Sequence, residues 1–113
     1  MKFDLEDRLV DFAGSIVLLC KDLPNDWTGL YYGKQLLRSG GSSALNFGEF
    51  QGAQTGKDKA FKLAIALKEL KESRMNLRIL KKVKYGNVDQ VNILLDEVEQ
   101  LIKILATIIR NKK

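Results

Sequence analysis

The chain has 113 residues, of which 45% are hydrophobic, and a formal net charge of +5 at pH 7. It has no histidine and one cysteine, so a single chain cannot provide a tetrahedral Cys/His zinc site, a catalytic pair that contains histidine, or an internal disulfide. A chain of this length and composition can bury a core without a disulfide or a metal, and we predict one domain over residues 1–113 with no metal and no cofactor.

The N-terminal stretch MKFDLEDRLVD is acidic and lacks the cationic start and apolar run of a secretory signal. No segment approaches the roughly 18 consecutive apolar residues that a membrane-spanning helix needs. We therefore expect a cytoplasmic protein with no membrane partner. The excess of cations leaves polyanions open as partners, but charge alone identifies none.

The first predicted helix spans residues 4–22. Its apolar side chains recur at steps of three or four and define one face: Leu5, Leu9, Phe12, Ile16 and Leu19. Cys20 follows an apolar run and is interpreted as a small buried hydrophobe. Pro24 disfavours helical geometry in the residue before it, so the helix should end there. Asn25 or Asp26 then offers an N-cap for the next helix.

The second predicted helix, residues 27–52, includes most of a stretch rich in glycine and serine, RSGGSSALNFGEFQGAQTGK at residues 38–57. A loop here would be a long structureless connection, which is uncommon inside a compact domain. A phosphate-binding P-loop is excluded, because Gln51 stands where its first glycine belongs and Asp58 stands where its Ser or Thr belongs. We therefore predict a helix.

Small residues at steps of three or four would share one face of this helix: Gly33, Leu37, Gly41, Ala44 and Gly48. Glycine lowers helix propensity by up to about 1 kcal/mol relative to alanine, so only tight packing justifies so many. Side chains this small let another helix come very close. We expect the substitution Gly41→Leu to disrupt folding or assembly.

Two more helices are predicted, over residues 57–84 and 88–111. The first contains no Gly or Pro and has one apolar face: Leu63, Ala66, Leu70, Leu77 and Leu80. Gly86 and Asn87 supply a stop and a cap, with Gln90 in the position of a capping box. The last helix has a broad apolar stripe: Val91, Leu94, Leu95, Val98, Leu101, Ile102, Leu105, Ile108 and Ile109. Nothing alternates with the period of two that a strand requires.

Positive charge is concentrated in residues 57–84, where ten cations and three carboxylates give +7 and leave the rest of the chain at −2. Six of these cations fall within an arc of roughly 140° of the predicted helix, and we call them the basic stripe: Lys68, Lys71, Arg74, Arg78, Lys81 and Lys82. The stripe suits the backbone of RNA or DNA, whose binding would depend on salt. A solvated face of an ordinary helix is the alternative, and no aromatic residue is interleaved to suggest base readout.

The same helix has a second set of apolar residues, which fall within about 40° of one another and away from the leucine face. We call this set the apolar seam: Phe61, Ile65, Ile79 and Val83. A helix of a four-helix monomer needs one buried stripe, so the seam predicts a subunit interface. The alternative is a helix central enough to be buried on two sides.

Three motifs, KQLLRS at 34–39, SSALNFGE at 42–49 and IALKELKE at 65–72, resemble the bacterial 23S rRNA intervening-sequence protein family. The resemblance covers nearly the whole chain and implies an all-α, up-down-up-down antiparallel four-helix bundle. It also implies a ring-like homo-oligomer, a pentamer, with no known catalytic activity. The family is similar to accessory proteins of diversity-generating retroelements, which are basic pentamers that associate with nucleic acid and a reverse transcriptase.

Carried over by position, Asn46, Glu49 and Glu72 match the family pattern. We interpret them as a buried polar network or as contacts between the second and third helices, because a catalytic pair would need a pocket that nothing in the sequence indicates. The resulting hypothesis is a non-enzymatic homo-oligomer that binds RNA or DNA backbone through the basic stripe. The rival hypothesis is a structural ring that meets another protein and has no nucleic-acid role.

Overall fold

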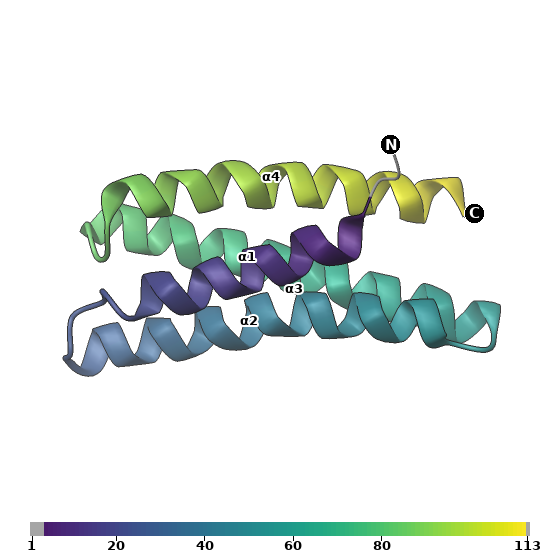
Figure 1. The fold of residues 1–113 in the computed structure, drawn as a ribbon, viewed down its shortest axis with the longest axis horizontal. Helices are drawn as coiled ribbons and strands as arrows, with labels where there is room; N and C mark the ends of the chain where they lie inside the picture. Colours follow the sequence, from purple (N-terminus) through teal and green to yellow (C-terminus); the bar gives the residue numbers. More distant parts are fainter. Residues whose placement is uncertain (1–3, 113) are drawn as a thin grey trace.

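The computed structural model of the protein describes residues 4–112, which form four helices (Figure 1). The helices are α1 (Leu5–Cys20), α2 (Trp27–Gly52), α3 (Gly56–Val83) and α4 (Val88–Asn111). They run alternately in opposite directions along a body of 44 × 28 × 19 Å. No strand occurs within the described residues. The predicted all-α bundle is therefore confirmed.

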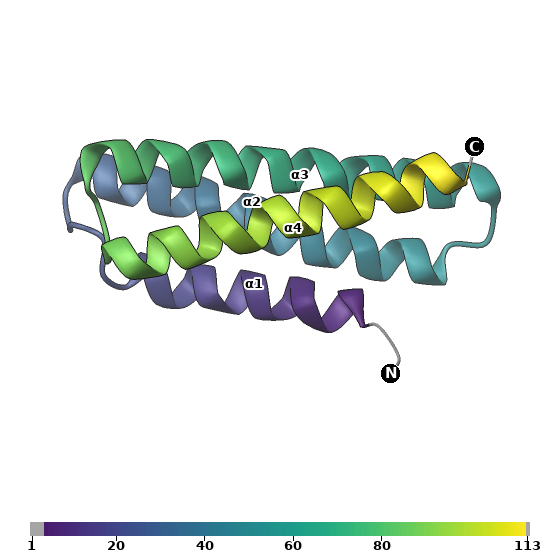
Figure 2. The ribbon, with the colours of Figure 1, turned by 90° about the horizontal axis from the view of Figure 1, so that it is seen from above.

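The four helices surround one core, and each packs against its neighbours in the order of the chain (Figure 2). The contact between α2 and α3 is the most extensive, and α1 closes the bundle with a smaller contact to α4. The connections from α1 to α2 and from α3 to α4 lie at one end of the bundle, and the connection from α2 to α3 lies at the other. As a result, α3 is flanked by α2 on one side and by α4 on the other.

The predicted apolar faces of α1 and α3 are buried, as the spacing of three and four residues requires. Every residue predicted for these two faces contributes to the core: Leu5, Leu9, Phe12, Ile16, Leu19, Leu63, Ala66, Leu70, Leu77 and Leu80. On α4, most of the predicted stripe is buried, whereas Leu95, Ile108 and Ile109 are partly buried and pack against its edge. Cys20 is half-buried against the same core, and burial raises the pKa of its thiol.

The helix ends follow the capping signals. Asp26 Oδ1 accepts a hydrogen bond of 2.7 Å from the Gly29 N–H, and Asn87 Oδ1 accepts one of 3.0 Å from the Gln90 N–H. Each of these bonds satisfies a backbone donor that has no partner within its helix. The first helix ends at Cys20, slightly before the predicted end at residue 22.

The face predicted for the small residues of α2 is wrong by about one residue of rotation. The buried side consists of Gly29, Gly33, Leu36, Ser39, Gly40, Ser43 and Phe47. Only Gly33 belongs to both sets, and Leu37 is exposed. A Cβ atom at Gly40 would collide with Ile16 Cδ1 of α1, whereas a Cβ atom at Gly41 would meet nothing within 4 Å. Gly40, rather than Gly41, is therefore the glycine that allows close approach.

A matched pair of substitutions tests this assignment. A Cβ atom at Gly29 would overlap the backbone carbonyl of Pro24, whereas the space beside Gly41 is open. We expect Gly29→Ala to lower the free energy of unfolding by about 1–3 kcal/mol through this overlap, and Gly41→Ala to raise it by about 0.4–1 kcal/mol through reduced freedom of the unfolded chain. Urea unfolding of both variants measures the difference, and equal effects would contradict the assignment.

Candidate nucleic-acid interface

The basic stripe lies on the side of α3 that faces away from the core. Five of its members are exposed, and Arg74 is half-buried. Arg74 Nη1 donates a hydrogen bond of 2.8 Å to Glu99 Oε1 on α4. This bond is the main reason why the pKa of Glu99 lies below its ordinary value. Arg74 therefore marks the border of the stripe with α4.

The remaining members of the stripe make no direct contact with a carboxylate among the described residues. Among residues 4–112, none of these five forms an ion pair: Lys68, Lys71, Arg78, Lys81 and Lys82. Ammonium and guanidinium groups donate hydrogen bonds but cannot accept them. Unpaired and exposed, these groups favour an anionic partner, and a guanidinium can bind a phosphate with two parallel hydrogen bonds.

Four members of the stripe line an open groove of about 640 Å³ between α3 and α4. Its lining consists of Arg74, Arg78, Lys81, Lys82, Leu95 and Glu99. Glu99 is the acidic member of this lining, and its carboxylate is already bonded to Arg74. The groove therefore combines three free cations with one neutralised pair, which suits a chain of phosphates better than a single small anion.

The apolar seam lies beside the basic stripe, on the side of α3 that faces α2. Phe61 and Val83 are exposed, and Ile65 and Ile79 are half-buried. The seam is thus reachable from solvent rather than enclosed by the bundle. Ile79 also lines an open groove of about 430 Å³ between α2 and α3. The outward surface of α3 consequently carries two parallel strips, one charged and one apolar.

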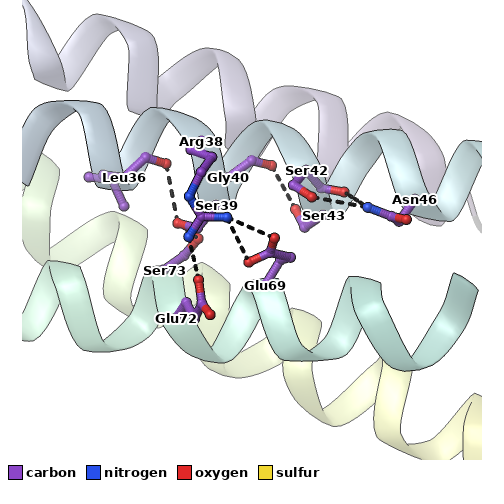
Figure 3. Close-up of polar contacts among 10 residues, drawn as sticks. All are labelled: Leu36, Arg38, Ser39, Gly40, Ser42, Ser43, Asn46, Glu69, Glu72 and Ser73. Carbon is purple, nitrogen blue, oxygen red and sulfur yellow. Dashed lines mark hydrogen bonds and ion pairs between the residues drawn. The ribbon is translucent and has the colours of Figure 1, made fainter.

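The three residues that match the family pattern make polar contacts on α2 and α3. Asn46 Nδ2 donates to the Ser42 carbonyl at 2.9 Å, a bond within α2 (Figure 3). Glu49 Oε1 lies 2.6 Å from Lys62 Nζ of α3, and Glu72 Oε2 accepts a bond of 2.5 Å from Arg38 Nη2 of α2. Two of the three residues thus join α2 to α3, and the structure does not bring Asn46, Glu49 and Glu72 together at one point.

Sequence reasoning missed the polar centre of the contact between α2 and α3 (Figure 3). Arg38 Nη1 donates to both carboxylate oxygens of Glu69, at 3.3 and 3.0 Å, and Glu69 is only 6% exposed. Nearby, the hydroxyls of Ser39 and Ser73 share a hydrogen bond of 2.7 Å, and both serines are fully buried. Glu69 and Ser73 are four residues apart and fall on the apolar face of α3. Their position on that face was the sequence signal that both are buried.

Comparisons with known proteins agree with this geometry. A crystal structure of a protein of unknown function from the S23 ribosomal protein family of Bacteroides thetaiotaomicron VPI-5482 superimposes with a TM-score of 0.86 and 35% identity. The match covers 94% of this chain and 98% of that chain. No curated protein matches the chain. No helix among residues 4–112 has the length and apolar character to cross a membrane.

The fold and these contacts define a four-helix bundle protein with a charged outer face on its third helix. The family model for the 23S rRNA-intervening sequence protein matches residues 2–107, so the chain belongs to that family. Membership confirms the resemblance predicted from the three sequence motifs.

Two arginine variants distinguish the buried contact from the exposed one. Arg38→Met leaves the Glu69 carboxylate buried without its donor, and we expect the free energy of unfolding to fall by about 1–3 kcal/mol. Arg74→Met removes a pair with the exposed Glu99 and should cost less than about 1 kcal/mol. Chemical denaturation of both variants measures the difference, and a loss at Arg74 equal to that at Arg38 would contradict it.

The Arg38 contact also predicts a dependence on pH. Its hydrogen bond is the main reason why the pKa of Glu72 lies below the ordinary value of 4.5. A depressed folded-state pKa gives stability that is fully present above the unfolded-state value and is lost as the pH falls through the folded-state value. The free energy of unfolding of Glu72→Gln should therefore decline less steeply than that of the wild type below about pH 4.5. Parallel slopes would show that the Glu72 pair adds no stability.

Proposed function

We propose that this protein is a non-enzymatic homo-oligomer that binds the backbone of RNA or DNA along the basic stripe. The observation that carries the proposal is the run of five exposed cations on α3 that form no ion pair within the described residues. Each phosphate that they neutralise releases counterions, so affinity would fall steeply with salt.

The stripe favours binding without sequence preference. Base readout needs side chains that reach base edges or stack on bases, and the lining of the groove between α3 and α4 contains no aromatic side chain. Contacts to phosphate position a protein on its ligand but carry no sequence information. The matched family is named for an intervening sequence of 23S rRNA, which makes RNA the first ligand to test.

The apolar seam supports the homo-oligomer part of the proposal. Exposed Phe61 and Val83 on a helix that already contributes a full face to the core are best explained by a second copy of the chain. The family resemblance implies a ring of five copies. Such a ring would repeat the basic stripe, and simultaneous contacts to one long polyanion would raise affinity without any new kind of contact.

The non-enzymatic part of the proposal is supported by the state of the two carboxylates that match the family pattern. Glu49 is paired with Lys62 and Glu72 is paired with Arg38. A carboxylate that acts as a general acid needs a raised pKa, whereas the hydrogen bond from Arg38 lowers the pKa of Glu72.

The second candidate is a scaffold that binds another protein, and the exposed aromatic residues of α2 favour it. Trp27 is 78% exposed and stacks on Tyr31 with ring centroids 5.9 Å apart. Tryptophan and tyrosine are enriched at protein interfaces. Under this hypothesis, pull-downs recover the same protein partners before and after nuclease treatment.

Titration of labelled single- and double-stranded RNA and DNA at two salt concentrations tests the nucleic-acid proposal. We expect binding at low salt that weakens steeply at high salt, and the double variant Lys71→Glu with Arg78→Glu should weaken binding to every sequence. If each side chain contacts one phosphate, the slope of log K against log salt should shrink by about two.

A matched control separates local contacts from net charge. Lys34→Glu with Arg110→Glu makes the same change in net charge at exposed positions on α2 and α4 and should retain most of the affinity. Absence of binding at low salt, or equal losses in the two double variants, would overturn the nucleic-acid proposal.

A further inference from the structure

The outward side of α1 is an apolar strip that no other helix among residues 4–112 covers. Val10, Val17 and Leu18 are 55%, 47% and 58% exposed, although α1 already buries its opposite face in the core. Gly14 lies among them, and a Cβ atom there would meet nothing within 4 Å. A glycine inside a helix costs roughly 0.5–1 kcal/mol relative to alanine, and no packing by residues 4–112 offsets this cost. We call these four residues the α1 outer face.

Negative charge predominates around the α1 outer face, although the exposed cation Lys21 lies one helical turn from Leu18. Residues 4–22 contain five carboxylates and two cations, a net charge of −3, and the cation Arg8 is bonded to Glu97 at 2.6 Å. The side-chain hydrogen bond with Asp4, followed by the negative charge of its neighbours, raises the pKa of Asp7. A positively charged partner would relieve this crowding of carboxylates.

An apolar surface of matching length lies along the groove between α2 and α3. Tyr31, Met75 and Ile79 line this groove, and Val83 continues it along the apolar seam. Met75 and Val83 are exposed and lie about 12 Å apart along the helix axis, which equals the separation of Val10 and Leu18 on α1. Arg38 and Glu72 in the groove lining pair with each other. Positive charge lies beside the groove at Lys71 and Arg78, which are one helical turn from Met75 in the segment of net charge +7.

We propose that the α1 outer face of one copy docks on the α2–α3 groove of the next copy, head to tail. The inference rests on the homo-oligomer of the proposed function and identifies the surface that covers the apolar seam. An α3–α3 contact would bring two segments of +7 together, and an α1–α1 contact would bring two segments of −3 together. Only the unlike contact gains from both apolar burial and charge.

This arrangement leaves the α4 side of the basic stripe accessible. Arg38 joins the α2 side of α3 to Glu72, and Arg74 joins the α4 side of α3 to Glu99, so the two grooves lie on opposite flanks of α3. A neighbour on the α2 flank would leave the groove between α3 and α4 open to a polyanion. Because the two contacting surfaces differ, the contact is heterologous and generates a ring or a filament rather than a two-fold dimer.

Two blocked chains test the head-to-tail contact. The α1-blocked chain carries Val10→Arg with Val17→Arg, and the groove-blocked chain carries Met75→Arg with Val83→Arg. All four positions are exposed, so circular dichroism should show an unchanged helix content. By light scattering, each blocked chain alone should have the mass of a monomer, because each lacks one of the two surfaces.

Mixing the blocked chains in equal amounts should restore one intact junction, between the α1 outer face of the groove-blocked chain and the groove of the α1-blocked chain. The other junction would place arginines against arginines, so the mixture should stop at a heterodimer of twice the monomer mass. Ile93→Arg changes an exposed apolar residue of α4 outside both surfaces and should keep the wild-type mass.

Three other results would contradict either the head-to-tail contact alone or the homo-oligomer as well. An α1-blocked chain that keeps the wild-type mass, or blocked chains that do not associate when mixed, overturns the head-to-tail contact but not the homo-oligomer. A wild-type monomer at micromolar concentration overturns both. If a blocked chain fails to fold, Asp7→Lys with Asp11→Lys applies the same test at exposed charged positions. That variant should weaken assembly at least tenfold at low salt, and unchanged assembly overturns the contact.

Discussion

The contact between α2 and α3, the most extensive in the bundle, is the constraint on which the rest of the molecule depends. The buried side of α2 consists largely of glycine and serine, with Leu36 and Phe47 as its large apolar members. The glycines of this side face α1 and the connection that follows it, where Gly40 meets Ile16 and Gly29 meets Pro24. Towards α3, the hydroxyl of Ser39 shares a hydrogen bond with that of Ser73, and the carboxylate of Glu69 accepts one from Arg38. A buried polar centre that is fully hydrogen-bonded fixes one register between two helices more strictly than apolar packing does.

The four helices could be predicted from local signals in the sequence, and their arrangement as an up-down-up-down bundle could be predicted from the family resemblance. Steps of three and four residues predicted the core faces of α1 and α3. Asn87 predicted the start of α4, and of the two caps predicted for α2, Asn25 or Asp26, the structure uses Asp26. The α2 face was predicted wrongly because glycines occur on both sides of that helix. Gly40 meets Ile16 of α1, whereas Gly41 meets open space, and no periodicity of small residues separates the two cases.

The candidate site could be predicted only in part. A helical wheel identified the basic stripe and the apolar seam, because both depend on spacing within one helix. The partners of charged residues depend on packing between helices, so the pairs of Arg74 with Glu99 and of Arg38 with Glu69 could not be seen. These two arginines lie on opposite flanks of α3, and their pairs define where the free positive charge begins and ends.

Assembly and polyanion binding are physically linked if both proposals hold. A homo-oligomer that repeats a segment of +7 accumulates like charge, which opposes association. A polyanion bound along the basic stripes neutralises that charge and so favours the assembled state. Linkage is reciprocal, so the assembled state must bind the polyanion more tightly than a single copy does. The acidic α1 and the basic α3 would then both contribute to assembly. The negative charge of α1 attracts the positively charged segment of the next copy, and the positive charge of α3 makes the stability of the assembly depend on a bound polyanion.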